Sequence, residues 1–233
     1  MLSPNPENRS IFVPEYWPLF QTAERRIFNY TCPDGTEISF RSEFSYDAFT
    51  KSMRYENYDS SSRWLNTWFY EYRPGFGIAE WRDDHPLNGW RRTLFGQQDR
   101  HVFLQPIGWG EYVYIGGEYQ NRPIKNTLYC WPPMFSVSHQ SIQFEERLAK
   151  FSTYHGLEYE DVLVFRYKQR FGKRSGGARY YNARGIGPVG IEWIHYQDDG
   201  SECVKTRVDA SVEFIHGGPE KNTLDSNSKC NFL

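Results

Sequence analysis

The stretch ARYYNARGIGPVGIEWIHYQDDGSECV, residues 178–204, decides the fold of this chain. Its centre, GIGPVG at 185–190, has the glycine spacing of a dinucleotide-binding turn. Such a turn must follow a strand and open a helix, because the helix N-terminus holds the pyrophosphate. Residues 191–197 are instead rich in β-branched and aromatic types, and the turn sequence DDG at 198–200 leaves no room for a crossover helix. The stretch therefore predicts a hairpin of two strands and no cofactor.

Glycines in such a hairpin are expected to supply positive φ angles or a close backbone approach. A similar stretch, FYEYRPGFGIAEWRDDH at 69–85, shares an aromatic strand, an Arg, a Gly-x-Gly turn and a strand ending in Glu-Trp with residues 180–199. Two explanations stay open, an internal duplication or the same hairpin formed twice. The expected structural turn residues are Gly75, Gly77, Gly185, Gly187 and Pro188.

The composition favours strands throughout. Aromatic residues make up 18% of the chain, and turn sequences recur at short intervals between β-branched and aromatic runs. Residues 161–169, DVLVFRYKQ, alternate as a strand with one wetter face would. We predict an all-β fold with a minor α component: an antiparallel curved sheet, either a half-barrel or a β-sandwich. Helices are expected only at 45–56 and 141–151.

The organisation expected along the chain has three parts. Residues 1–20 contain four prolines, which exclude a long helix or a central strand and predict an extended arm anchored by its aromatic residues. Residues 21–216 form one β-rich domain, with 21–135 and 136–216 as two halves if the repeat is a duplication. Residues 217–233 are a polar tail.

Two segments, GLEYEDVLVFRYKQ at 156–169 and GGARYYNARGIGPVGIEW at 176–193, carry a family resemblance. Together they resemble the closing part of bacterial β-rich domains, many of them exported lipoproteins of LolA-like shape. The resemblance covers about residues 156–195 and implies an antiparallel, curved sheet. It implies nothing about a ligand or an activity.

Motifs of catalysis and metal binding are missing from the sequence. No nucleophile elbow, zinc-binding helix, phosphate loop or EF-hand loop is present, and the histidines and cysteines are dispersed, so no metal is expected. The net charge of −2 does not indicate the basic surface that nucleic-acid binding requires. No apolar run approaches the ~18 residues of a membrane span. Residues 1–20 lack an export signal, so we expect cytoplasmic synthesis and use without export, with possible incorporation into a particle.

Three residues are candidates for acid–base chemistry if the protein is an enzyme: Glu80, Glu192 and His195. Each Glu precedes a Trp on a short strand, and two carboxylates from related hairpins would suit glycoside hydrolysis if they faced one cleft. The alternative is a solvent-facing Glu beside a buried Trp. No residue is assigned as catalytic.

Aromatic side chains are the candidates for contact with a ligand or partner. Such contacts are expected at Trp17, Trp109, Tyr112, Tyr114, Tyr119 and Trp131. A concavity for a sugar or a hydrophobic ligand would be lined by Trp64, Trp68, Trp81, Trp90, Trp109, Trp131, Tyr112, Tyr114 and Tyr119. The alternative is a role in the core, since the chain has few Met residues to fill it.

Three functional hypotheses follow. The first is a non-catalytic structural or interaction component of a larger assembly, such as a virus or phage particle, with protein partners or self-association. The second is a module that binds a small molecule: a lipid, a sugar or a pigment. The third is an enzyme that uses a carboxylate in a β cavity.

Overall fold

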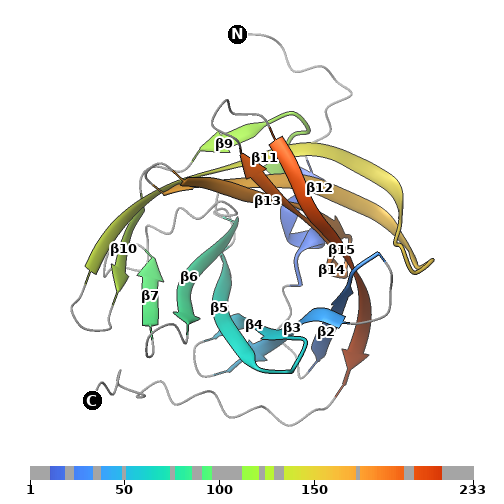
Figure 1. The fold of residues 1–233 in the computed structure, drawn as a ribbon, viewed down its shortest axis with the longest axis horizontal. Coiled ribbons are helices and arrows are strands. Elements are labelled where there is room, and N and C mark those ends of the chain that lie inside the picture. Colours follow the sequence, from blue (N-terminus) through green and yellow to red (C-terminus); the bar gives the residue numbers. More distant parts are fainter. Residues whose placement is uncertain are drawn as a thin grey trace.

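Strands make up nearly all of the described chain (Figure 1). The computed structural model describes residues 11–18, 24–33, 38–48, 51–73, 77–85, 91–95, 112–120, 124–128, 134–171, 174–196 and 202–216. Side chains are described within 11–18, 24–33, 39–48, 51–72, 112–118, 141–168, 176–194 and 206–216. The other residues, including the tail 217–233, lie outside the description.

The elements follow one another as a succession of strands with one short 3-10 helix. They are β1 (Ile11–Phe12), η1 (Val13–Tyr16), β2 (Arg25–Thr31), β3 (Ile38–Asp47), β4 (Ser52–Asp59), β5 (Trp64–Arg73), β6 (Gly77–His85), β7 (Arg91–Phe95), β8 (Tyr112–Val113), β9 (Glu118–Gln120), β10 (Ile124–Leu128), β11 (Met134–Ser152), β12 (Glu158–Phe171), β13 (Arg174–Ala183), β14 (Gly187–Tyr196) and β15 (Glu202–Ile215).

Thirteen of these strands form one antiparallel sheet in the order β10-β7-β6-β5-β4-β3-β2-β15-β14-β13-β12-β11-β9. The sheet curls strongly, and β10 pairs with both β7 and β11, which links the two sides of the curl (Figure 1). β1 and β8 form a separate two-stranded sheet. The prediction of an all-β, antiparallel, curved sheet of half-barrel form is confirmed.

Residues 174–196, which contain the glycine-rich stretch 185–190, form a hairpin. β13 and β14 pair antiparallel, with Ala183 opposite Gly187 and Arg179 opposite Glu192. The residues after the glycines continue as strand β14 to Tyr196, so no helix is present to receive a pyrophosphate. The similar stretch forms the β5–β6 hairpin, in which Arg73 lies opposite Gly77.

Both expected helices are wrong, and the described residues contain no α-helix. Residues 45–56 lie mostly in β3 and β4. Residues 141–151 lie within β11, where Phe144, Leu148 and Phe151 imitate a helical spacing of four and three. A bulge between Phe144 and Glu146 shifts the register, so that Phe144 packs in one cluster and Leu148 in another.

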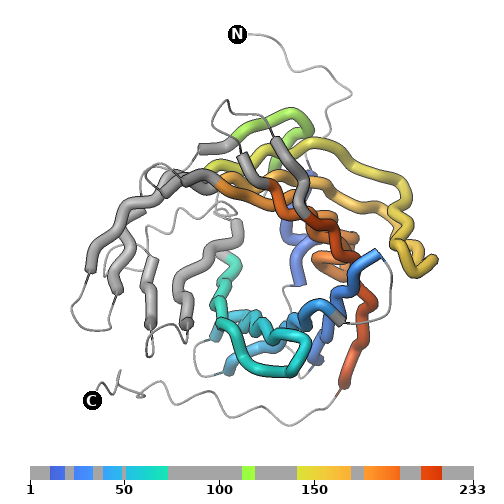
Figure 2. The backbone as a smooth tube through the Cα atoms, viewed as in Figure 1, coloured from blue at the N-terminus to red at the C-terminus, as the bar shows by residue number. Residues whose placement is uncertain are grey.

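The larger core cluster lies on the inner face of the curl. Residues opposite one another in an antiparallel pair share a face, so the pairs Met53–Tyr70 and Tyr55–Trp68 define this inner face on β4 and β5. Residues 11–18, named the inner arm, contribute Ile11, Val13, Tyr16 and Trp17 to the same cluster. The inner arm therefore lies inside the curl, beside the β13–β14 hairpin (Figure 2).

Candidate functional site

The inner arm docks on the turn between β13 and β14, and this end of the curl is named the arm end. The amide of Gly185 donates to the carbonyl oxygen of Glu15 at 2.6 Å, and Arg184 Nη2 lies 2.7 Å from Glu15 Oε1. Asn182, 1% exposed, donates from Nδ2 to the carbonyl oxygen of Tyr16 at 3.0 Å. These bonds satisfy backbone groups of an arm that has no long strand partner of its own.

Two glycines make this docking possible. Gly185 has a φ of +70° and Gly187 has a φ of +118°, and residues that carry a Cβ rarely adopt such angles. A Cβ on Gly187 would lie 3.0 Å from Pro18 Cδ and 3.3 Å from Phe28 Cζ, whereas a Cβ on Gly185 would meet nothing within 4 Å. Gly187 therefore permits both the turn and the close approach of the inner arm.

Asp161 ties the inner arm to the neighbouring hairpin. Tyr16 donates its hydroxyl to Asp161 Oδ1 at 2.9 Å, and Arg147 donates from Nε and Nη2 to the two carboxylate oxygens at 2.6 and 2.8 Å. The Arg147 hydrogen bonds hold the pKa of Asp161 below its ordinary value. Burial, followed by the bond to Asp161, raises the pKa of Tyr16 to about 12.

Two tracks of aromatic rings extend along the inner face from the arm end. In one, Trp17 contacts Phe44 at 6.3 Å between ring centroids, Phe44 stacks on Tyr55 at 4.1 Å, and Tyr55 contacts Trp68 at 5.2 Å. The rings close to the inner arm are buried, with Phe44 at 0% and Trp17 at 8% exposed. Trp68, at the far end of the track, is only half-buried.

The second track has the same gradient of exposure. Tyr30, at 0% exposed, stacks on Phe40 at 4.3 Å, and Phe40 contacts Trp193 at 5.6 Å. Phe40 is half-buried and Trp193 is 39% exposed. Phe40, Trp68 and Trp193 are thus the accessible ends of the two tracks, and these three residues together are named the open end.

A chain of polar side chains lies on the inner face next to these rings. Tyr55 hydroxyl and Ser42 Oγ are 3.0 Å apart, and Ser42 Oγ donates to Asn57 Oδ1 at 2.7 Å. Asn57 Nδ2 donates to Asn66 Oδ1 at 2.6 Å. Ser42 and Asn57 are buried and Asn66 is half-buried, so the chain leads outward to Asn66.

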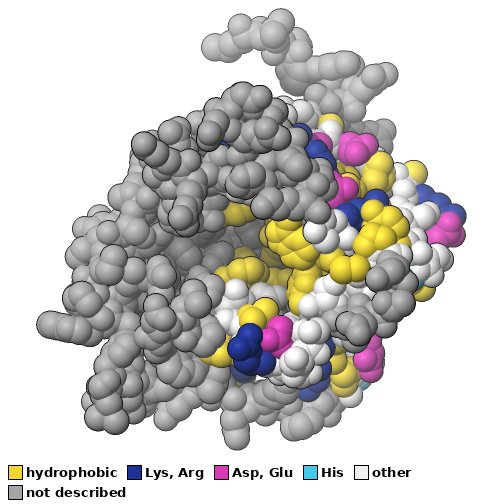
Figure 3. All heavy atoms as spheres, viewed as in Figure 1, with side chains coloured by type: hydrophobic (Ala, Val, Ile, Leu, Met, Phe, Trp, Pro, Cys, Tyr) yellow, Lys and Arg dark blue, Asp and Glu magenta, His cyan; other side chains and the backbone are white. Residues whose placement is uncertain are grey.

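The molecule is hollowed at the centre of the face shown in Figure 3, and hydrophobic side chains of the described residues line part of that hollow. Aromatic rings and a few fixed polar groups around a concavity are the usual lining of a small-molecule site. The rings of the open end can therefore offer flat apolar contact, and the half-buried amide of Asn66 can offer hydrogen-bond donors.

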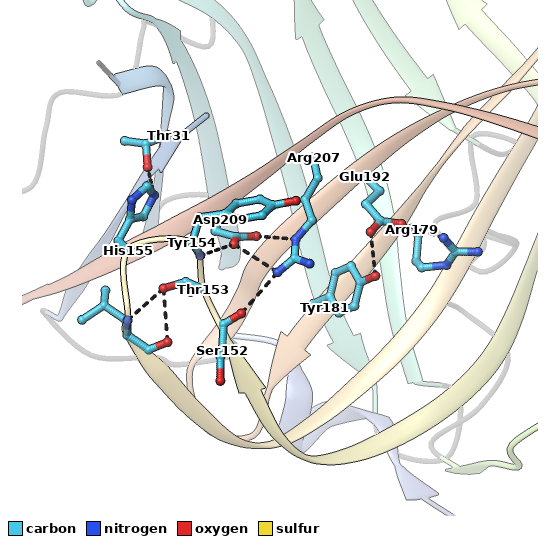
Figure 4. Close-up of polar contacts among 11 residues, drawn as sticks. Thr31, Ser152, Thr153, Tyr154, His155, Arg179, Tyr181, Glu192, Arg207 and Asp209 are labelled. Carbon is cyan, nitrogen blue, oxygen red and sulfur yellow. Dashed lines mark hydrogen bonds and ion pairs between the residues drawn. The ribbon is translucent and has the colours of Figure 1, made fainter. Parts of the chain in front are cut away.

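The catalytic candidate Glu192 lies in a polar cluster on the face of the sheet opposite the inner face (Figure 4). Its Oε2 accepts from Arg179 Nη1 at 2.6 Å and its Oε1 accepts from the Tyr181 hydroxyl at 2.9 Å. Burial, followed by the hydrogen bond that Tyr181 donates to Glu192, raises the pKa of Tyr181. Both carboxylate oxygens are engaged in holding neighbouring strands together.

Arg207 occupies the centre of the same cluster (Figure 4). It donates to Asp209 from Nε at 2.8 Å and from Nη2 at 3.1 Å, and Asp209 also accepts the amide of Tyr154 at 2.8 Å. The guanidinium lies 4.8, 4.5 and 5.4 Å from the ring centroids of Phe151, Tyr154 and Tyr181. This packing fixes the β11–β12 hairpin onto β15.

The other catalytic candidates are placed only by their backbones. Glu80 lies on β6 and His195 on β14, and neither side chain is described. Glu192 has no partner carboxylate at hydrogen-bond distance among the described side chains. Within the described part of the chain, no group of three His, Cys, Asp or Glu side chains could hold a metal ion.

The expected contact residues fall in different places. Trp17 is buried in the core, whereas Tyr112 and Tyr114 are 55% and 45% exposed beside the inner arm, where Tyr112 contacts Phe12 at 5.2 Å. Tyr119 lies on β9 with its side chain outside the description, and Trp109 and Trp131 lie outside it entirely. The turn residue Gly75 is also outside, Gly77 begins β6, and Pro188 lies buried in β14.

Sequence reasoning missed the polar chain of Ser42, Asn57 and Asn66. The signal was present in the run WLNTWFY at 64–70, where Asn66, Trp68 and Tyr70 alternate on one face of a strand. What the sequence lacked was the register that brings Asn57 opposite Asn66 and Ser42 opposite Asn57.

Among the described residues, no helix has the length and apolar character to cross a bilayer. The sequence matches no protein-family model and no curated protein. Among solved structures, the chain is similar to a protein from Bacteroides fragilis that is inferred to be exported and has a YmcC-like fold. The two share 12% identity and a TM-score of 0.44, and the match covers 84% of this chain and 98% of that chain.

The description of that neighbour as exported contradicts the expectation of cytoplasmic synthesis and use without export. The resemblance of residues 156–195 to LolA-like domains is not confirmed by these comparisons. At this degree of similarity, the neighbour assigns neither a ligand nor an activity to this chain.

Proposed function

We propose that this protein is a non-catalytic binding protein that holds a small molecule with an apolar face at the open end of the curled sheet. One observation carries the proposal. The aromatic rings of the inner face are covered near the inner arm but stay half-buried or exposed at Phe40, Trp68 and Trp193. Accessible rings of this kind lose their unfavourable contact with water when a ligand covers them.

The packing of the inner arm also supports the proposal. Trp17 packs edge-on against Tyr70 at 5.4 Å and against Phe44, so apolar side chains already occupy the arm end. A ligand entering the curl would therefore meet a packed floor and the accessible rings of the open end. A preformed wall of this kind costs little ordering on binding.

Trp68 and Trp64 offer a matched test because both are half-buried and both lie on β5. Trp68 pairs with Tyr55 on the inner face, whereas Trp64 donates to Thr67 Oγ1 at 2.8 Å on the opposite face. The apolar probe 1-anilinonaphthalene-8-sulfonate is titrated into the full chain and followed by its fluorescence. Trp68→Ala should weaken binding by about tenfold, equivalent to roughly 1.4 kcal/mol, while Trp64→Ala leaves it unchanged.

Near-UV circular dichroism of each variant serves as the control, since this probe also binds loosely folded states. Equal loss in both variants, or no saturable binding by the folded wild type, would refute the proposal. The structural role in a larger assembly and the enzymatic role of Glu80, Glu192 or His195 stay predictions that no observation tests.

A further inference from the structure

We infer that the small molecule is a saccharide, and that Asn66 donates hydrogen bonds to it while Trp68 packs against its ring. This inference rests on the proposed function and adds the ligand class. Apolar binding alone does not explain the polar chain on the inner face. Four polar groups on one wall of an aromatic interior cost free energy unless each has a partner.

The hydrogen bonds of the chain fix the orientation of its two amide groups. Asn57 uses Oδ1 to accept from Ser42 and Nδ2 to donate to Asn66, so its amide orientation is set from both sides. Asn66 Oδ1 is the acceptor of that last bond, which directs the Asn66 Nδ2 group away from Asn57. An Asn amide nitrogen carries two donor hydrogens.

Asn66 Nδ2 has no acceptor among the described side chains. Asn66 and Trp68 are two residues apart on β5 and therefore share the inner face. The Asn57–Asn66 and Tyr55–Trp68 pairs are adjacent in the register of β4 and β5. A donor directed away from Asn57 and a half-buried indole thus stand side by side on the inner face of β5.

This pairing matches the two surfaces of a sugar. A pyranose presents hydroxyl oxygens that accept from an amide N–H and a face of C–H groups that packs on an aromatic ring. An acyl chain would cover the indole but displace water from Asn66 without replacing its hydrogen bond, which leaves a donor unsatisfied and lowers affinity. The polar chain therefore favours a saccharide over a lipid.

The test uses isothermal titration calorimetry of the full chain with maltotriose, cellotriose and chitotriose, and with laurate as the lipid probe. We expect saturable binding of at least one saccharide. Asn66→Asp keeps the shape of the side chain and its acceptor for Asn57 but replaces the two outward donors, and it should weaken that binding at least tenfold. Asn29→Asp is the control, because Asn29 lies opposite Arg41 on the other face of the sheet.

The outcomes separate this inference from the proposed function. Saccharide binding that is unchanged in Asn66→Asp overturns the role of Asn66, and no binding of any of the three saccharides overturns the ligand class. If laurate or the naphthalene probe still binds in a Trp68-dependent manner, the proposed function stands without the saccharide. Should Asn66→Asp fail to fold, Asn66→Ser, which shortens the side chain away from the open end, tests the same point.

Discussion

Replacing Gly187 by Ala should destabilise the protein more than the same change at Gly185, although both residues lie in one turn. Both have positive φ, so each substitution carries backbone strain of about 1–3 kcal/mol. Only Gly187 lies against the inner arm, where the new Cβ would come within 3.0 Å of Pro18 Cδ and 3.3 Å of Phe28 Cζ. Overpacking of this kind adds about 1–3 kcal/mol. We therefore expect a loss of about 2–6 kcal/mol for Gly187→Ala and about 1–3 kcal/mol for Gly185→Ala.

Urea unfolding, followed by tryptophan fluorescence, measures both losses, since the indole of Trp17 is buried beside Phe44 in the folded state. A second background separates strain from crowding. In Pro18→Ala the ring atoms that crowd Gly187 are gone, so the excess cost of Gly187→Ala over Gly185→Ala should shrink by about 1 kcal/mol or more. Equal losses at the two glycines, or an excess that does not shrink in Pro18→Ala, would show that the inner arm does not dock on this turn.

Other changes test other contacts. The folded-state pKa of Asp161 lies below its unfolded value because Arg147 donates to its carboxylate, so its stabilising contribution is present above about pH 4 and is lost as pH falls further. The difference in unfolding free energy between wild type and Asp161→Asn should thus be constant from pH 7 to about pH 5 and shrink toward pH 3; growth of the difference on acidification would contradict this. Gly190→Ala would place a Cβ 2.9 Å from Phe151 Cζ and should cost about 1–3 kcal/mol in urea unfolding, and an unchanged midpoint would argue against the packing of Phe151 on β14. Asp209→Ala removes the carboxylate partner of Arg207 and should cost about 2–3 kcal/mol, with faster amide exchange at Tyr154; retained protection there would exclude the bond.

The β13–β14 hairpin could be predicted because its information is local. The run after Gly187 has strand-forming residues and no helical stripe, and a turn sequence follows it within ten residues. The same local rules failed at 141–151, since a bulge after Phe144 replaces strict alternation with a helix-like spacing. A bulge depends on the partner strand β12, which a single segment does not reveal.

The candidate site was harder to predict because its parts are distant in sequence. The aromatic residues of the inner arm were expected to anchor it, but the contacts that hold it are distant: Asn182 of β13, which donates to the Tyr16 carbonyl oxygen, is 166 residues away. Trp68 was among the aromatic candidates, while Asn66 was not. Its importance follows from the register of β3, β4 and β5, which is a property of the assembled sheet.

The most direct test of a ligand at the open end is fluorine NMR of the full chain labelled with 5-fluorotryptophan. Each resonance is assigned by single Trp→Phe variants and followed during titration with the saccharide that calorimetry identifies. The resonances of Trp68 and Trp193, which belong to the open end, should shift during the titration and give the same dissociation constant. The resonances of Trp17 in the core and of Trp64 on the opposite face should not shift. Shifts confined to Trp17 or Trp64, with Trp68 and Trp193 unmoved, would contradict the account.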